Sequence, residues 1–194
     1  MKEIMKLGLI LFAITAFSAM LLGFAHEITK EPIENQVRLA REKAMNETLS
    51  QADRFEEVMV ELPKGSKISE INAGYKGDLL EGFVVKVSPK GFGGPIEIMV
   101  GVSKDGIVQG IKMLKHSETP GLGANAEDDS FTSQYKDTSG ELTVTKTIPN
   151  KDNEIQALTG ATITSRAITD GGNEVLIFLQ HHGGTDEEIT FDFN

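Results

Sequence analysis

The residues with the clearest potential for chemistry are the hydroxyls of the stretch "LTGATITSRAI". Three threonines and a serine surround a Gly-Ala pair where a helical pattern begins: Thr159, Thr162, Thr164 and Ser165. The start of a helix gathers unpaired N–H groups and the positive end of the helix dipole, so it stabilises an anion, above all a phosphate. The simpler alternative is that Thr162 or Thr164 caps the helix. The stretch therefore predicts either a phosphate-binding or phosphorylated site, or a capped helix.

The acidic composition and the lack of cysteine narrow the possible functions. The formal net charge is -10, and no basic stripe is available to bind phosphates, so nucleic acid is not expected as a partner. The chain has no cysteine, which excludes disulfides, thiol catalysis, Cys-ligated zinc and Cys-held iron–sulfur clusters. Any redox chemistry must therefore come from a cofactor.

Other polar clusters carry weaker signals. His181 and His182 could bind a metal, but adjacent helical residues point about 100° apart, so pairing with the helix C-terminus is favoured. The acidic triplet at residues 127–129 is better explained as a solvated helix start than as a cation site. Neither a Ser-His-Asp arrangement with local support nor a phosphate-binding P-loop is present in the sequence. We therefore predict no metal site and no catalytic residue.

The N-terminal region reads as a membrane anchor. Residues 7–25 contain no charge, and at 1.5 Å per residue they would extend ~29 Å, about one hydrocarbon core. A cleaved signal peptide is the alternative, because Gly23-Phe24-Ala25 offers small residues at suitable offsets. Two lysines precede the span and four basic residues follow it before residue 44, so the positive-inside rule does not decide the orientation.

A second helical pattern follows the span. Apolar residues recur there at helical spacing, and Pro32 stands where a first helical turn tolerates it: Ile33, Val37, Ala40 and Ala44. We expect this stripe to pack on the domain behind it rather than to bind a partner helix. A break at Pro63-Lys64-Gly65 completes a three-part division: an anchor at 1–26, an amphipathic helical segment at 27–62 and a folded domain at 63–194.

The folded domain is predicted to be α+β, with an antiparallel sheet packed with helices. The stretches "GFVVKVS", "PIEIMVGV" and "GIVQGIKMLKH" read as strands, and Asp105-Gly106 as a hairpin turn. The polar loop "HSETPGLGANAEDDS" leads to a short helix at Asp129 to Tyr135 and a short strand, "ELTVTKT". The last helix has an apolar face despite Gly171-Gly172: Ala167, Ile168, Gly171, Val175, Leu176 and Leu179. The C-terminal "GGTDEEITFDFN" is a tail or an edge strand.

The threonine cluster carries a resemblance to a known family. Thr159-Gly160-Ala161-Thr162-Ile163-Thr164 resembles the flavinylation motif Ser/Thr-Gly-Ala-Ser/Thr-x-Ser/Thr of FMN-binding domains. These domains occur in the G subunit of Rnf complexes and the C subunit of sodium-pumping NADH:quinone oxidoreductases. "GFGGPIEIMVGV", "HSETPGLGA" and "GATITSRAI" resemble Rnf G-subunit segments in the same order behind one N-terminal span, so the resemblance covers nearly the whole chain. Phe92 departs from it where the family often has Tyr, and a ring hydroxyl is lost.

The resemblance implies a covalent cofactor. Thr162 would carry FMN through a phosphoester bond, installed by a separate flavin transferase that uses FAD as donor. Thr159, Gly160, Ala161 and Thr164 would shape the turn and donate hydrogen bonds to the phosphate. The "ETPGLG" loop would form a wall of the flavin site, with polar contacts from Glu118 and Thr119, the turn residue Gly121, and Leu122 against the ring. An ordinary Pro-Gly turn is the alternative for this loop, and Gly91 to Gly94 is either a close backbone approach or a plain loop.

The resemblance also implies a function. The chain would be an electron-transfer subunit, not an independent enzyme, of a membrane complex that couples ferredoxin oxidation and NAD reduction to ion transport. Its partners would be the other membrane subunits, and its soluble domain would lie outside the cytoplasmic membrane behind a single span. Two alternatives stay open. One is a membrane-tethered binding or scaffold module without cofactor, and the other is a stand-alone extracytoplasmic flavin carrier.

Overall fold

The computed structural model describes residues 1–182. The chain divides into two compact units, Met1–Arg41 and Glu42–Asn194, and helix α1 (Lys2–Thr48) contributes to both. The C-terminal tail or edge strand predicted at residues 183–194 lies outside the described residues.

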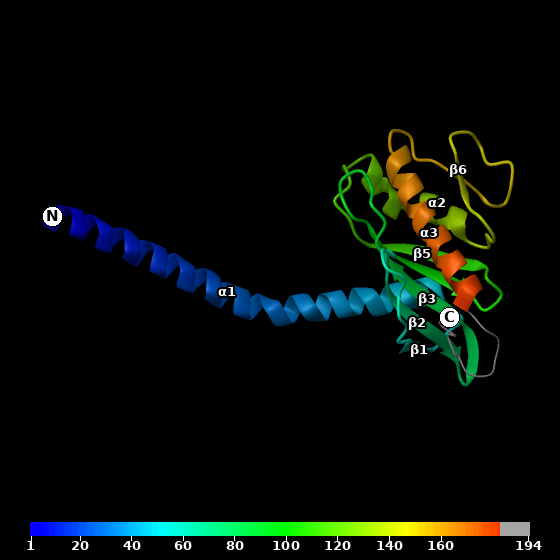
Figure 1. The fold of residues 1–194 in the computed structure, drawn as a ribbon, viewed down its shortest axis with the longest axis horizontal. Coiled ribbons are helices and arrows are strands. Elements are labelled where there is room, and N and C mark those ends of the chain that lie inside the picture. The colour runs from blue at the N-terminus through cyan, green and yellow to red at the C-terminus, as the bar shows by residue number, and fades with distance from the viewer. Residues whose placement is uncertain (183–194) are drawn as a thin grey trace. The chain divides into compact units, whose positions relative to one another are not determined.

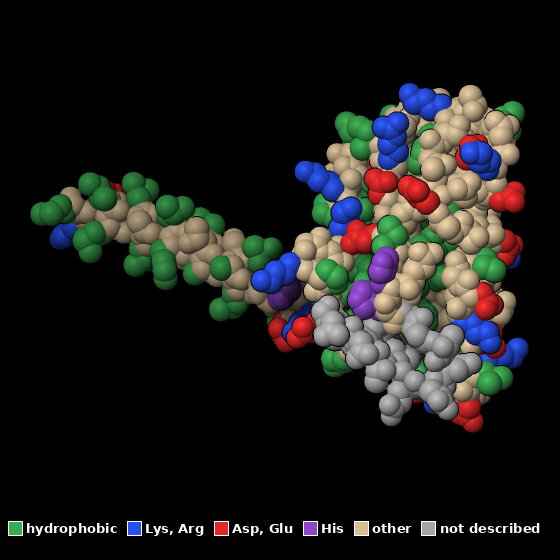
Figure 2. Space-filling model, turned by 45° about the vertical axis from the view of Figure 1, so that its right-hand side comes forward, with side chains coloured by type: hydrophobic (Ala, Val, Ile, Leu, Met, Phe, Trp, Pro, Cys, Tyr) green, Lys and Arg blue, Asp and Glu red, His purple; other side chains and the backbone are tan. Residues whose placement is uncertain are grey.

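Helix α1 is the one helix within residues 1–182 that is long and apolar enough to cross a membrane. Figure 2 shows hydrophobic side chains all along its N-terminal part, whereas Lys, Arg, Asp and Glu are mixed over the second unit. Pro32 lies inside this continuous helix. Ile33 and Val37 are exposed, and of the predicted stripe only Ala44 is buried.

The predicted amphipathic helical segment at 27–62 is helical over a shorter range. Helix α1 ends at Thr48, and strand β1 (Arg54–Glu57) follows after a short turn. The side chains between them explain the change, because Leu49 and Ala52 are buried and Phe55 packs beside them. Tertiary packing thus overrides the local helical pattern. The boundary at residue 26 between anchor and helix stays a prediction.

Five antiparallel strands form the main sheet in the order of the sequence (Figure 1). They are β1, β2 (Ile68–Lys76), β3 (Leu79–Val87), β4 (Glu97–Ser103) and β5 (Val108–Lys115). The three predicted strands and the hairpin are confirmed, and Gly106 has the positive φ, 77°, that the turn needs. Strand β2 was not predicted because Asn72 and Gly74 interrupt its apolar pattern. A Cβ at Gly74 would lie 2.6 Å from Leu49 Cδ2, so close packing requires the glycine.

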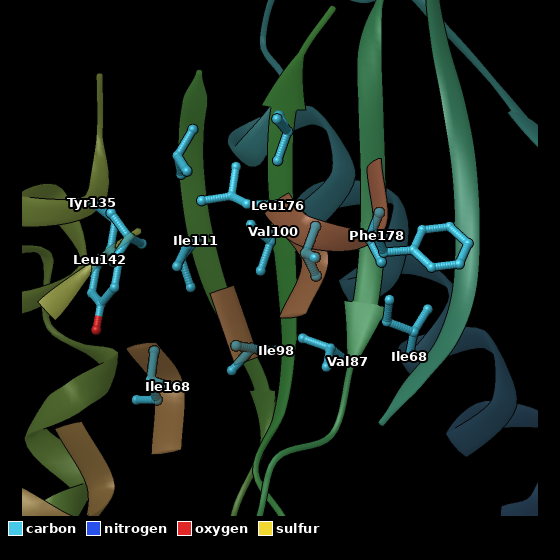
Figure 3. Close-up of a cluster of buried hydrophobic side chains, with 14 of the residues drawn as sticks. Ile68, Val87, Ile98, Val100, Ile111, Tyr135, Leu142, Ile168, Leu176 and Phe178 are labelled. Atoms are coloured by element: carbon cyan, nitrogen blue, oxygen red, sulfur yellow. The ribbon is translucent and has the colours of Figure 1, made fainter. Parts of the chain in front are cut away.

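Alternate side chains of the sheet serve two different cores, as the period of a strand requires. On one face, Val85, Ile98 and Val100 pack against α3 (Thr162–His182), whose Ile168 and Leu176 are buried there (Figure 3). The buried α3 residues include every member of the predicted apolar face.

The opposite face of the sheet receives the last turn of α1. Val84 and Met99 pack there with Met45 and Leu49. Gly101 and Gly110 are opposite each other in the register of β4 and β5. A Cβ at Gly101 would overlap the carbonyl oxygen of Thr48. The paired glycines therefore leave room for the backbone at the end of the helix.

Short elements connect the sheet to α3. They are η1 (Gly123–Glu127), α2 (Asp129–Thr132), η2 (Ser133–Tyr135), β6 (Thr143–Thr145) and β7 (Glu154–Gln156). The helix predicted at 129–135 is therefore made of two pieces, and β6 pairs with β7 in parallel. At the end of α3, the Nδ1 atoms of His181 and His182 lie 2.8 and 3.0 Å from the carbonyl oxygens of Ile177 and Phe178. The two rings thus bind the last helical turn.

The glycine pair inside α3 yields a matched stability prediction. At Gly172 a Cβ would make an ordinary contact, 3.5 Å from Leu142 Cδ1, whereas at Gly171 it would lie 3.0 Å from Pro89 Cγ. Alanine favours a helix interior over glycine by roughly 0.5–1 kcal/mol. We expect Gly172→Ala to raise the free energy of unfolding by about that amount. Gly171→Ala should gain less or lose stability. Urea unfolding of the full-length variants in detergent measures both, and equal effects would contradict the packing argument.

A second prediction concerns Tyr135, which is buried in the core beside α3 (Figure 3). Its hydroxyl lies 2.8 Å from Thr169 Oγ1, which itself donates to the Ser165 carbonyl, so the phenol is the donor. Burial is the largest cause of the raised pKa of Tyr135, and the charge of Asp170 acts in the same direction. The folded phenol therefore stays protonated at a pH where the unfolded one ionises, above about pH 10.

We expect Tyr135→Phe to lower the free energy of unfolding by about 1 kcal/mol at neutral pH, because one hydrogen bond is lost. This deficit should shrink as the pH rises above about 10, because only the wild type is destabilised by ionisation of the unfolded phenol. Urea unfolding at neutral pH and near pH 10.5 tests the sign. A deficit independent of pH would show that the phenol does not titrate as described.

Candidate functional site

The turn that precedes α3 is built by its own small residues. Gly160 has a φ of 76°, a conformation that favours glycine. The Ala161 N–H donates to the Leu158 carbonyl at 3.0 Å. Ser165 ties the turn to the helix: its Oγ accepts the Leu158 N–H at 3.0 Å and donates to the Ala161 carbonyl at 3.0 Å. This serine was noticed in the sequence, but its role in closing the turn was not.

Thr162 is the first residue of α3 and is half-buried. Its hydroxyl has no hydrogen-bond partner anywhere in the described chain, residues 1–182. The N–H groups of Thr162, Ile163 and Thr164 also lack an acceptor in that part of the chain. These are the donors that a helix leaves free at its start. The helix start thus offers three N–H groups and one hydroxyl to an anion.

The alternative that a threonine caps this helix is wrong. A cap would accept an N–H of the first turn through its side-chain oxygen. Thr162 makes no such bond among the described residues, and Thr164 Oγ1 instead donates to Glu118 Oε2 at 2.5 Å. Helix α3 therefore begins without a threonine cap, and the Thr162 hydroxyl stays available.

Glu118 joins three segments that are far apart in the sequence. Its side chain is buried, and its Oε1 accepts the Gly93 N–H at 2.8 Å while its Oε2 accepts the Thr164 hydroxyl. Glycines surround the carboxylate. A Cβ at Gly91 would lie 2.5 Å from Oε1, and one at Gly123 would lie 2.6 Å from Oε2. Of the two alternatives for Gly91 to Gly94, the close backbone approach is therefore the one that the structure has.

The "ETPGLG" loop reaches the same place. The N–H groups of Leu122 and Ala124 both donate to the Thr119 carbonyl at 3.1 Å, and Gly121 has a φ of 75°. Leu122 Cδ2 lies 3.0 Å from the position of a Cβ on Gly160, and the Leu122 side chain is 44% exposed. The loop is therefore a Pro-Gly turn that also places an exposed apolar side chain against the motif.

His116 holds the start of this loop. Its Nδ1 accepts the Glu118 N–H at 3.1 Å, and its Nε2 lies 2.8 Å from Glu127 Oε1. Because Nδ1 is an acceptor, Nε2 carries the proton and donates to Glu127. Sequence reasoning missed His116, since its partners are two and eleven residues away in an irregular loop and no regular spacing marks them.

The predicted site residues therefore separate into three groups: the turn before α3, a buried pair and the loop before η1. Thr159, Gly160, Ala161 and Thr162 lie together in the turn, and Leu122 touches it. Glu118 and Thr164 are buried and bound to each other, so they do not face outward as polar contacts. Thr119 is exposed and supplies its carbonyl to the loop turn.

The exposed groups fit a phosphorylated flavin. The free donors at the start of α3 suit a phosphate. Three exposed apolar side chains belong to the segments that meet there: Phe92 (69% exposed), Leu122 (44%) and Ile163 (55%). A flat aromatic ring could cover these side chains and remove apolar surface from water. The residues present are thus compatible with FMN at Thr162.

Comparisons with known proteins point the same way. The FMN-binding domain model matches residues 91–177, and the RnfG N-terminal region model matches residues 1–48. The G subunit of the Na(+)-translocating ferredoxin:NAD(+) oxidoreductase complex of Acetobacterium woodii is 37% identical over 187 residues, covering 89% of each chain. The G subunit of the proton-translocating ferredoxin:NAD(+) oxidoreductase complex of Clostridium ljungdahlii is 41% identical over 167 residues, covering 84% of this chain and 85% of that one.

The fold is also similar to that of a solved structure. The C subunit of the Na(+)-translocating NADH-quinone reductase from Parabacteroides distasonis superposes with a TM-score of 0.57. The match covers 75% of this chain and 94% of that chain at 14% identity. At this identity the likeness shows the fold alone, and it confirms the predicted antiparallel sheet packed with helices.

The glycine packing around Glu118 can be tested by a single methyl group. At Gly123 a Cβ would lie 2.6 Å from Glu118 Oε2 and 2.7 Å from Thr164 Oγ1. We expect Gly123→Ala to lower the free energy of unfolding by about 1–3 kcal/mol, as overpacking does. Urea unfolding measures the loss, with Gly172→Ala as the control for adding the same methyl in an open place. An unchanged stability would mean that the two side chains are not packed as described.

Proposed function

Since the chain belongs to the family of G subunits of Rnf-type ion-translocating oxidoreductase complexes, we propose that it carries FMN covalently on Thr162 and transfers electrons within such a complex. The observation that carries this proposal is the state of the Thr162 hydroxyl. It stands at the start of a long helix, half-buried and without a hydrogen-bond partner among residues 1–182. The hydroxyls of Thr164 and Ser165 are engaged in the fold, and Thr159 is exposed and precedes the helix.

The attachment would be a phosphoryl transfer. The Thr162 oxygen forms a bond to the flavin-side phosphorus of FAD, the bond from that phosphorus to the bridging oxygen breaks, and AMP leaves. The hydroxyl proton passes to a base of the flavin transferase. The product is a phosphodiester with one negative charge, which the free N–H groups at the start of α3 can bind. Thr159, Gly160 and Ala161 would form the turn around that phosphate.

The bound flavin would supply the electron-accepting chemistry that the side chains of this chain lack. The protein's own residues would hold and orient the ring through three exposed apolar side chains: Ile163 of the motif, Leu122 beside Gly160, and Phe92 on the loop bound to Glu118. A covalent bond prevents loss of the cofactor. That matters in the proposed location, with α1 spanning the cytoplasmic membrane and the soluble domain outside the cytoplasm, where free FMN would be dilute.

The relatives also support the proposed partners. The proteins from Acetobacterium woodii and Clostridium ljungdahlii are subunits of ion-translocating ferredoxin:NAD(+) oxidoreductase complexes. We infer that this chain assembles with other membrane subunits of such a complex and is matured by a flavin transferase. A stand-alone flavin carrier would not copurify with several multi-span proteins, so isolation of the chain from its native membrane distinguishes the two assemblies.

The attachment site is tested by mass spectrometry of full-length protein made together with a flavin transferase. We expect one FMN adduct on Thr162. Thr162→Ala should fold but stay colourless, because the nucleophilic oxygen is absent. Thr162→Ser should retain the adduct, since the hydroxyl remains. Thr143→Ala is the control: it removes an exposed hydroxyl of β6, outside the motif, and should still become yellow. An adduct on another residue, or none on the wild type, would refute the assignment.

A further inference from the structure

Glu118 and Thr164 lie beneath the surface of the site and are not exposed on it. The Glu118 side chain is 5% exposed and that of Thr164 is 1% exposed. We propose that they form a positioning pair: the Thr164–Glu118 hydrogen bond fixes two loops to the turn that presents Thr162, and neither residue binds the flavin. The flavin as occupant of the site rests on the proposed function. The hydrogen bond between Thr164 and Glu118 does not, because it forms in the protein without cofactor.

Both oxygens of the Glu118 carboxylate are engaged in hydrogen bonds. One oxygen accepts an N–H from Gly93 at 2.8 Å, and the other accepts an O–H from Thr164 at 2.5 Å. Both partners are donors in these bonds, so both oxygens act as acceptors, as in an ionised carboxylate. Hydrogen bonds to a charged group are stronger than neutral ones. The carboxylate thus holds both partners and has little surface left for a ligand.

The first loop that the pair positions carries Phe92. The Gly91 N–H donates to the Gly94 carbonyl at 2.8 Å, which closes the loop on itself. The Gly93 N–H then fastens it to Glu118. A Cβ at Gly93 would overlap the carbonyl oxygen of Ser117, so the backbones of the two loops are in direct contact. Phe92 projects from this anchored loop as an exposed ring.

The second loop carries Leu122 and is fixed by the other carboxylate oxygen of Glu118, Oε2. Glu118 belongs to this loop, and its bond to Thr164 ties it to the first turn of α3. Leu122 then meets Gly160, two residues before Thr162. Without the Thr164 hydroxyl, the loop and the helix start would lose this buried polar link. The role of Thr164 is therefore different from that of Thr162, although both are threonines of one motif.

The first experiment uses flavin-free full-length protein in detergent and measures amide hydrogen exchange. Thr164→Val keeps the shape of the side chain and removes the donor, whereas Thr164→Ser keeps the donor. We expect Thr164→Val to speed exchange in the loop at residues 91–95 by about tenfold or more, as expected for loss of a bond to a charged group. Thr164→Ser should exchange like the wild type. Unchanged exchange in Thr164→Val would overturn the proposal.

Glu118→Met provides an independent variant. The thioether keeps most of the length of the side chain but has no oxygen, and its sulfur is a weak acceptor, so the bonds from Gly93 and Thr164 are lost. We expect faster exchange in the same loop. Adding Thr164→Val to Glu118→Met should increase exchange by less than the product of the two single effects, because both changes disrupt one link. Fully multiplicative effects would show that the two residues act separately.

The second experiment follows FMN transfer to Thr162 and the visible circular dichroism of the attached flavin. We expect Thr164→Val to slow transfer by about tenfold and to weaken the dichroism, because the loops no longer hold the ring in one orientation. Thr164→Ser should restore both. Equal rates and spectra in Thr164→Val and wild type would refute the positioning role. If the wild type takes up no FMN but the exchange pattern is as expected, the proposed function fails and the pair stands.

Discussion

The site depends on the hydrogen bonding of one buried carboxylate. A charged group inside a protein is tolerated only when its oxygens are matched by donors. Glu118 meets this demand with an N–H from the loop at 91–95 and an O–H from the start of α3. Satisfying the carboxylate therefore requires three distant segments to meet at one point. The glycines at positions 91 and 123 leave the room that this meeting needs.

The unpaired groups at the start of α3 differ from the polar groups around Glu118, which all have partners. Around Glu118 every buried polar side-chain atom of the described residues has a partner. The Thr162 hydroxyl and the first N–H groups of α3 have none within residues 1–182, and Thr162 is half-buried rather than enclosed. A fold that satisfies its interior polar groups this fully leaves free donors only where solvent or a ligand can bind them. In the proposed function the free donors bind the phosphate, and the satisfied groups support the backbone that carries them.

The sequence predicted those parts of the structure that follow from local patterns. The alternation of Val and Ile marked β3, β4 and β5, the spacing of apolar residues marked α3, and small residues marked the turn before it. It could not predict β1 and β2, because Gly74 is required by a contact with Leu49 that only the fold creates. For the same reason the hydrogen bond between Glu118 and Thr164 was not predicted. Their bond links residues 46 positions apart, and the local spacing of residue types does not predict contacts at such a separation.

The open character of the site is consistent with covalent attachment. A cofactor held only by contacts needs a pocket that surrounds it, since binding energy must offset the lost freedom of the ligand. Here the apolar side chains proposed to hold the ring are all substantially exposed: Phe92, Leu122 and Ile163. A ring resting on them would keep one face or edge open. The proposed phosphodiester to Thr162 would remove the need for enclosure, and an open ring would let electrons pass to a neighbouring protein of the complex.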